Sequence, residues 1–401
     1  MTIDNEIVRV RDLSRSMIAR YVEWGPKRRT GAHHLSVYKD VTDFVNFRME
    51  TAESCLDLLE KNKVADALGL CRSLLENLLL LKLQCRGDKF FQLQSLQFKT
   101  PTEIREYLAE QQKDLEEKHA RGESLACLYV ANYPRENKAL MYVFEGLLDS
   151  TVPGFHIPMH FFQFQEFRPE TMRLKDEDYF DYYEPPQSVR DAQKKFQKEA
   201  RFLYKHFLSY DALIYCLQLN DLLDPSATTR VEAHYTFLGT FLHPTIGVAR
   251  GLHEQSNHHT GGTAVGMDQN YSKAAILMAN CYVGYLLADI LDEIASFFES
   301  APARYISDAG TADLRALTAS VPDTIPYFWF INNEAPPHDR FNHAVNISTD
   351  AELTKYGDYT HLPTELIKFD SHIYSSFSNG LSGWSNRRVG VYAAPFLDAG
   401  V

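Results

Sequence analysis

The sequence predicts an all-α fold: a multi-helix bundle with an aromatic-rich insertion and an irregular C-terminal appendage. Apolar residues recur at helical spacing through most of the first 300 positions, which is the pattern of amphipathic helices. Hydrophobic residues make up 45% of the 401 residues and charged residues 23%, as in soluble globular proteins. We expect one bundle in two halves, residues 1–150 and 187–300, with the insertion at 151–186 and the appendage at 301–401.

The first half of the bundle is expected to contain five helices. Gly25-Pro26 ends the first, because glycine and proline disfavour continuation of a helix. The third becomes apolar nearly all round after Leu78, which predicts a central place in the bundle. Thr100-Pro101 marks the start of the fourth, since proline is favoured in a first helical turn. The expected helices cover residues 4–24, 33–62, 63–85, 100–121 and 136–148.

The insertion at 151–186 mixes many Phe and Tyr residues with prolines and acidic residues. Disordered segments are poor in aromatic residues, so we expect this one to be ordered and docked on the bundle. If its apolar side faces outward, it offers a surface for a second copy of the chain or for another protein partner.

The second half of the bundle is expected to contain three helices. Ser188 and Asp191 form a capping-box-like start for the first, and Asp224-Pro225 breaks the chain after it. Helical patterns cover residues 188–223, 227–242 and 269–300. Beyond them the periodicity fades, and the aromatic run from Tyr327 to Ile331 is interpreted as either a buried strand or a docked anchor.

Charge and cysteine content restrict the class of protein. A formal net charge of −12 disfavours a broad nucleic-acid binder, because phosphate contacts favour a basic surface, although a local basic cleft is compatible with it. The N-terminus lacks an apolar signal segment, and no apolar run is interpreted as a membrane span, so we expect a cytoplasmic protein without membrane contact. The cysteines lack zinc-site spacing and are expected to be reduced core thiols without a disulfide: Cys55, Cys71, Cys85, Cys127, Cys216 and Cys281.

Two polar signatures stand inside apolar helical sequence. Arg72 and Glu76 are spaced i, i+4 and therefore share one helix face. Tyr235, Gly239 and His243 continue the same spacing on another expected helix. Buried charge is costly unless it is paired, so convergence of these side chains would make either a structural clasp or an active site. We predict that Arg72, Glu76, Tyr235 and His243 lie within one contact shell.

A simpler interpretation of each signature stays open. Arg72 and Glu76 are compatible with an ordinary solvated polar stripe, and His243 with a histidine that caps a helix end and bonds a loop. In the functional interpretation, Arg72 holds an anion, Glu76 orients Arg72, and His243 transfers a proton beside that fixed positive charge.

Both signatures carry a resemblance to a known family. The helix Leu70–Glu76, which reads LCRSLLE, and the downstream segment Tyr235–Pro244 resemble the domain-of-unknown-function family 5677, over about residues 40–90 and 190–300. That family usually has serine where this chain has Gly239, which puts in doubt any role for a hydroxyl there. The resemblance implies an all-helical bundle in which Arg72, Glu76, Tyr235 and His243 meet, and it implies no settled activity.

Bundles of this kind are similar in outline to HEPN domains, many of which are ribonucleases of toxin and antiphage systems with an Arg-x4–6-His pattern. Such an arginine stabilises phosphorane-like charge and the histidine moves a proton. Arg201 and His206 match this loose pattern, as do Arg29 and the histidines at 33 and 34. Because apolar Phe202 follows Arg201, we interpret that match as a coincidence on a helix surface.

A third cluster contains histidines that are close in sequence. It lacks HExxH spacing, so a flexible polar loop is preferred over a metal site, and a metal hydrolase is a third function class. The chain also lacks Walker, GxGxxG and GxSxG motifs. We therefore expect no cofactor and no metal. The cluster consists of His253, Glu254, His258, His259 and Asp268.

Two function classes remain. The first is a HEPN-like, metal-independent ribonuclease or toxin-type effector of bacterial antiphage defence, which implies RNA as a partner and a catalytic set of Arg72, Glu76, Tyr235 and His243. The second is a non-catalytic helical sensor or scaffold, in which the same residues form a structural clasp. A basic, phosphate-sized cleft at Arg72 and His243 would favour the enzyme. A dry, fully paired interior cluster would favour the scaffold.

Overall fold

A computed structural model describes most of the helical part of the chain. The described residues are 2–28, 37–86, 210–219, 221–243, 248–253, 270–301, 306, 308–369 and 371–389, together with residues 113 and 117 and five short strands between 127 and 174. Helices that pack on one another form the body of the protein, which confirms the all-α, multi-helix class.

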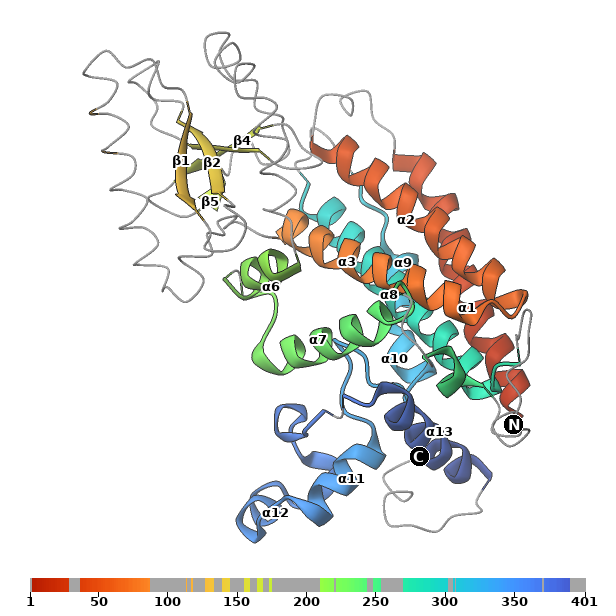
Figure 1. Cartoon of the computed structure of the whole chain (residues 1–401). Coiled ribbons are helices and arrows are strands. Elements are labelled where there is room, and N and C mark those ends of the chain that lie inside the picture. The colour runs from red at the N-terminus through yellow and green to blue at the C-terminus, as the bar shows by residue number, and fades with distance from the viewer. Residues whose placement is uncertain are drawn as a thin grey trace.

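Helix α8 (Lys273–Glu299) is the centre of the bundle, and Figure 1 shows α1 (Ile3–Trp24), α2 (Val37–Glu60) and α3 (Val64–Arg86) packed around it. The Ser272 hydroxyl starts α8 by accepting a hydrogen bond from the Ala275 amide at 3.1 Å. Almost every later residue of α8 is buried, which is typical of a helix with apolar residues on all faces.

The length and composition of α8 correct the expectation that no apolar run of the sequence qualifies as a membrane span. Its most apolar window has a mean hydropathy of 1.7, so by these two measures it is long and apolar enough to cross a membrane. Within the protein, 89% of that window is buried. The neighbouring helices α1, α2, α3 and α9 (Ala312–Ala319) provide this cover, as they do for the core helix of a large bundle.

Two shorter helices lie along α3 and position the candidate site. Helix α7 (Pro225–Gly239) starts at Asp224, whose carboxylate accepts a hydrogen bond from the Ala227 amide at 2.7 Å. Pro225 occupies the first helical turn, where its missing N–H costs nothing. Helix α6 (Tyr210–Leu219) precedes this break and also packs on α3. The expected interruption at Asp224-Pro225 is therefore confirmed.

A small antiparallel sheet lies between α3 and α6 in the sequence, and the sequence analysis did not predict it. Its strands follow chain order, each paired with the next. Strand β2 replaces the helix expected near 136–148, because its aromatic and branched residues favour extended backbone. The strands are β1 (Cys127–Asn132), β2 (Ala139–Phe144), β3 (Phe155–Pro158), β4 (Phe164–Arg168) and β5 (Arg173–Leu174).

The sheet crosses the boundary that was drawn between residues 150 and 151, and the last three strands belong to the aromatic insertion. The side chains of that insertion, and the docking expected of it, lie outside the described residues.

The last hundred residues contain short helices rather than only irregular structure. The run from Tyr327 to Ile331 is buried without forming a strand, so of the two interpretations it is the docked anchor. Four of its five residues belong to the main hydrophobic core. The helices here are α10 (Val321–Thr324), α11 (Pro337–Asn346), α12 (Asp350–Tyr356), η8 (Tyr359–His361), η9 (Thr364–Leu366) and α13 (Ile373–Val389).

Cys55, Cys71, Cys85 and Cys281 are buried free thiols, as expected for core cysteines. Burial raises the pKa of the Cys281 thiol well above its ordinary value, which keeps it protonated and unreactive. The side chains of Cys127 and Cys216 lie outside the described residues.

Two short helices complete the described body: η1 (Gly25–Arg28) and η6 (Ala249–Leu252).

Candidate functional site

The candidate site lies where α3 and α7 cross, and glycines allow the two helices to approach closely. A Cβ atom added at Gly239 would lie 3.4 Å from Arg72 Nε, and one added at Gly69 would lie 3.2 Å from a methyl carbon of Leu242. Position 239 of α7 therefore faces position 72 of α3, and position 242 faces position 69. This opposite order along the two helices places Tyr235 beside Glu76.

Three of the four expected residues meet at this crossing. The Arg72 guanidinium donates a hydrogen bond through Nη2 to the Tyr235 hydroxyl. The same hydroxyl donates to Glu76 Oε1 at 2.9 Å, and Arg72 Nη2 lies 3.4 Å from that oxygen. The phenol oxygen thus bridges the cation and the anion, so all three polar groups have partners.

The aromatic ring of Tyr235 is contacted on both faces. Arg72 Cζ lies 4.3 Å from the ring centroid, which is a cation–π distance. The ring of Tyr210, from α6, stacks on Tyr235 with 3.6 Å between centroids and 15° between planes. A guanidinium and a stacked ring cannot both fit at these distances on one face, so Arg72 and Tyr210 occupy opposite faces.

The surroundings of Tyr235 keep its hydroxyl protonated. Burial raises the pKa of Tyr235 first, and the hydrogen bond to Glu76 and the charge of Glu76 raise it further, while Arg72 lowers it. Tyr235 is therefore a neutral hydrogen-bond donor to Glu76 and an acceptor from Arg72. A tyrosinate nucleophile or base is not favoured here.

The cluster lies at the edge of the protein interior. The Arg72 side chain is 18% exposed and that of Glu76 is 38% exposed. The Arg72 Nε atom is buried and makes no hydrogen bond among the described residues, and it faces Gly239. A serine hydroxyl at position 239 would offer Nε an acceptor.

His243, the fourth expected residue, lies beyond the end of α7. Helix α7 ends at Gly239, and residues 240–243 form a turn with hydrogen bonds from Phe241 and Leu242 to carbonyls three residues back. The helical i, i+8 spacing therefore does not continue to His243. Its side chain is exposed and shares no hydrogen bond or ion pair with Arg72, Glu76 or Tyr235 in the described structure.

Of the other histidine candidates, only His253 lies among the described residues. The ring of His253 packs edge-on against Tyr271 with 4.8 Å between centroids, and these two residues form an isolated β-bridge. Within the described residues, no group of three or more His, Cys, Asp or Glu side chains is placed to hold a metal ion. The remaining members of the three motifs lie outside the described residues: Arg29, His33, His34, Arg201, His206, Glu254, His258, His259 and Asp268.

Sequence reasoning passed over His234, although it begins the second signature. His234 is wholly buried, with Nδ1 2.8 Å from the Tyr282 hydroxyl and Nε2 3.1 Å from the Trp329 carbonyl oxygen. Burial lowers the pKa of His234 to about 3, the Trp329 carbonyl raises it in part, and the charge of Arg230 lowers it. The sequence feature that could have indicated its burial is the position of His234 on the apolar stripe of α7, between Val231 and Leu238.

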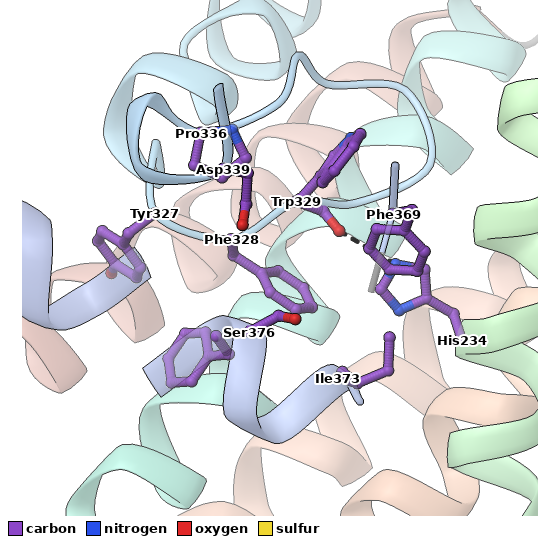
Figure 2. A pocket seen from close by; sticks show the side chains of 10 residues that line it. His234, Tyr327, Phe328, Trp329, Pro336, Asp339, Phe369, Ile373 and Ser376 are labelled. Carbon is purple, nitrogen blue, oxygen red and sulfur yellow. Dashed lines mark hydrogen bonds between the residues drawn. The ribbon is translucent and has the colours of Figure 1, made fainter. Parts of the chain in front are cut away.

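A small pocket opens beside His234, between α7, the segment after Tyr327 and α13 (Figure 2). Most of its walls are aromatic or aliphatic, and Asp339 and Ser376 add polar groups. Because both ring nitrogens of His234 already have partners, His234 joins α7 to α8 and to the C-terminal segment and is not available as a base. The lining residues are His234, Tyr327, Phe328, Trp329, Pro336, Asp339, Phe369, Ile373, Ser376 and Phe377.

A second charged cluster links α3 to α8. Lys82 Nζ lies 3.7 Å from Asp289 Oδ2, and Arg86 pairs with Glu293. Burial raises the pKa of both carboxyl groups, although the basic partners lower it. Asp289 Oδ2 and Glu293 Oε2 are buried without a hydrogen bond among the described residues. These pairs hold the C-terminal end of α3 against the core helix at a cost in desolvation.

Among the described residues, Arg72, Glu76 and Tyr235 thus form one hydrogen-bonded cluster with Tyr210 stacked against it, and His243 shares no hydrogen bond or ion pair with that cluster. Arginine, glutamate and neutral tyrosine can bind an anion or hold two helices together, and here each is engaged with the others. In comparisons with family models, curated proteins and solved structures, this chain matches none of them.

Proposed function

We propose that this protein is a non-catalytic helical sensor or scaffold in which Arg72, Glu76 and Tyr235 form a structural clasp between α3 and α7. The observation that carries the proposal is the Tyr235 hydroxyl, which accepts from Arg72 and donates to Glu76 at the same time. Each charge is matched inside the cluster, as in a structural pair that offsets its own desolvation.

The position of His243 supports the same proposal. A proton-transfer group has to reach the reacting atoms that the cation stabilises, and His243 bonds none of the cluster residues. The chain between Gly239 and His243 turns away from the helical path, so the two signatures supply a clasp and a separate exposed histidine.

A HEPN-like ribonuclease of the toxin or antiphage type is the second candidate, and one observation favours it. Arg72 and Glu76 remain partly exposed, and the exposed His243 follows directly after Leu242, which lies beside Gly69 of α3. A bound phosphodiester that spans this crossing would use Arg72 for charge and His243 for proton transfer.

The experiment that separates the two candidates measures stability and RNA cleavage on the same variants. The scaffold proposal expects no cleavage of single-stranded or structured RNA by the parent protein. It also expects Arg72→Ala to lower the free energy of unfolding by about 1–2 kcal/mol, because a hydrogen bond and a cation–π contact are lost. His243→Ala should leave stability unchanged, since an exposed side chain without partners contributes little.

The opposite pattern would overturn the scaffold proposal. RNA cleavage by the parent protein that disappears in both Arg72→Ala and His243→Ala, with unfolding unchanged in His243→Ala, would establish the ribonuclease in its place. His361→Ala is the comparison, because that histidine is also exposed and lies in η8, within the C-terminal segment, where its exposed ion pair with Asp358 contributes little. Its activity and stability should equal those of the parent protein.

A further inference from the structure

We propose that the pocket beside His234 binds the head group of a small alkylammonium cation. The pocket shares no residue with the clasp, so this proposal does not depend on the role of Arg72, Glu76 and Tyr235. The space among the lining residues amounts to about 240 Å³, part of which is open to solvent. Pockets for drug-sized ligands occupy roughly 300–1,000 Å³, so this one suits a small head group.

Aromatic rings meet at steep angles around the pocket. The rings of Trp329 and Phe369 stand at 87° to one another with 5.0 Å between centroids. Those of Phe328 and Phe377 stand at 82° with 5.7 Å between centroids. Aromatic walls recognise alkylammonium groups, because the face of each ring attracts positive charge. The walls of this pocket therefore provide the apolar and electrostatic parts of such a site.

The ring of Trp329 already interacts with a cation of the protein. Arg230 Cζ lies 5.3 Å from the centroid of this ring. Arg230 is not one of the lining residues, and its Nη1 atom donates to the carbonyls of Phe330 and Asn333. The guanidinium is thus held outside the pocket by backbone acceptors.

The charge of the walls favours a cation over an anion. Asp339, in α11, is the one lining residue with a formal charge in the described part of the chain, because burial lowers the pKa of His234 to about 3 and keeps its ring neutral. Figure 2 shows that the Asp339 carboxylate and the Ser376 hydroxyl end beside the ring of Phe328. A carboxylate accepts several hydrogen bonds and attracts an ammonium group, whereas it repels a phosphate or another carboxylate.

The pocket is built so that the charged group lies near its opening. Asp339, Phe369 and Ser376 are half-buried, whereas Phe328 and Trp329 are buried. An alkylammonium ion that enters from the half-buried side can place its nitrogen beside Asp339 and its carbon atoms against the rings. Little of its charge is then taken far from solvent, which limits the cost of desolvation.

The indole N–H resonance of Trp329 reports binding at this pocket. The chain contains three tryptophans, so comparison with Trp329→Phe assigns the resonance in the isotope-labelled full chain. Choline is titrated in parallel with its neutral analogue, in which carbon replaces the charged nitrogen. We expect choline to shift the resonance with a dissociation constant at least about ten-fold below that of the neutral analogue, because only choline makes cation–π contacts.

Two variants test the pocket itself. Asp339→Asn keeps the size of the side chain and removes its charge, and we expect the affinity for choline to fall about ten-fold or more. Ser376→Leu keeps the charge but fills the space, and it should abolish binding. Asp350→Asn is the matched control, because Asp350 is an exposed acid in the first turn of α12, outside the pocket. Its affinity for choline should equal that of the parent protein.

The source of the head group is a free amine or the end of a lysine side chain, and a second probe distinguishes them. The amide of Nα-acetyl-trimethyllysine carries the same head group as choline on a lysine side chain. Tighter binding of choline indicates a free amine, and tighter binding of the lysine derivative indicates a lysine of another protein.

Any of three outcomes overturns the proposal. Choline that causes no shift, or that binds only as well as its neutral analogue, shows that the pocket does not recognise a cation. Unchanged affinity in a folded Asp339→Asn shows that the carboxylate is not used, and unchanged affinity in Ser376→Leu places any binding elsewhere. If thermal unfolding shows that Asp339→Asn is not folded, Ser376→Leu and the neutral analogue decide. RNA cleavage by the parent protein would defeat the scaffold proposal and would leave these measurements unaffected.

Discussion

The Tyr235 hydroxyl lies between two opposite charges, donating to Glu76 Oε1 at 2.9 Å and accepting from Arg72. This relationship between Tyr235 and Glu76 joins α7 to α3 by a bond between side chains 159 positions apart in the chain. A charge-assisted hydrogen bond is stronger than a neutral one. The stability of the crossing therefore depends on one oxygen atom.

Removing that oxygen is the most direct test of the clasp. Tyr235→Phe keeps the ring between Arg72 and Tyr210 but leaves two charged groups without their bridge. We expect a loss of about 1–2 kcal/mol in the free energy of unfolding, measured by urea denaturation. Tyr356→Phe is the control, because its ring and hydroxyl interact with the exposed Lys355 and bridge no pair of opposite charges among the described residues. An equal loss in both variants would show that the bridge contributes nothing specific.

Gly239→Ser should stabilise the protein. Its Cβ would lie 3.4 Å from Arg72 Nε, an acceptable contact with a flexible side chain, and the hydroxyl would offer an acceptor to a buried N–H that has none. Glycine is also a poor helix former, so we expect a gain of about 1 kcal/mol.

Gly239→Ala separates the two causes of that gain. Alanine supplies the helix propensity without the acceptor, and it has a higher propensity than serine. If the free energy of unfolding is higher for Gly239→Ala than for Gly239→Ser, the Arg72 Nε atom does not use the added hydroxyl.

The buried His234 predicts how stability changes with pH. Its pKa is lowered to about 3 in the folded protein, so protons bind the unfolded chain preferentially. The stabilising contribution is present above the ordinary histidine pKa near 6.5 and is lost as the pH falls toward 3. Between pH 7 and pH 5 the expected loss is about 2 kcal/mol.

Comparison with His234→Gln isolates this contribution. Glutamine keeps a donor and an acceptor but does not titrate, so the dependence of unfolding free energy on pH should be shallower between pH 6.5 and pH 4. Parallel curves for the parent protein and His234→Gln would mean that His234 binds its proton equally well in the folded state.

Removing one partner of the ion pair between Lys82 and Asp289 should destabilise the protein, whereas replacing both partners with apolar residues should change its stability little. Lys82→Met leaves a buried carboxylate without its partner, and we expect a loss of about 3 kcal/mol. Adding Asp289→Leu should recover most of that loss, because both desolvation costs are then removed. Urea unfolding of the single and double variants gives the coupling between the two positions.

The pH dependence of Asp289 has the opposite sign to that of His234. Burial raises the pKa of Asp289, so its stabilising contribution is present below the ordinary carboxyl pKa and is lost as the pH rises through the raised value. The Lys82→Met/Asp289→Leu variant should therefore gain stability relative to the parent protein as the pH rises from 4 to 7. A constant difference over this range would contradict the raised pKa.

Several helices were predictable from local patterns. The expected helix over 4–24 is α1 at Ile3–Trp24, and that over 63–85 is α3 at Val64–Arg86. Helix α8 lies within the range expected at 269–300. Apolar periodicity and capping residues act over a few residues, so a linear sequence contains them. The small sheet was missed because its strands are short and are paired with one another rather than defined by a local pattern.

The candidate site was predictable only in part, for reasons that concern particular residues. The pairing of Arg72 with Glu76 follows from their separation along one helix. The end of α7 at Gly239 prevented His243 from following the same rule. His234, whose two ring nitrogens both have partners, was passed over because these partners come from α8 and from the carbonyl of Trp329.

The positions of α1, α3 and α8, the i, i+4 pair and the burial of four cysteines follow largely from interactions between near neighbours, which the amino-acid order contains. The meeting of Tyr235 with Arg72, the stacking of Tyr210 and the docking of Tyr327–Ile331 on the core depend on how helices pack. Packing joins residues that are more than a hundred positions apart. Local sequence patterns allow several arrangements of the helices, and the free energy of burying apolar surface selects among these arrangements.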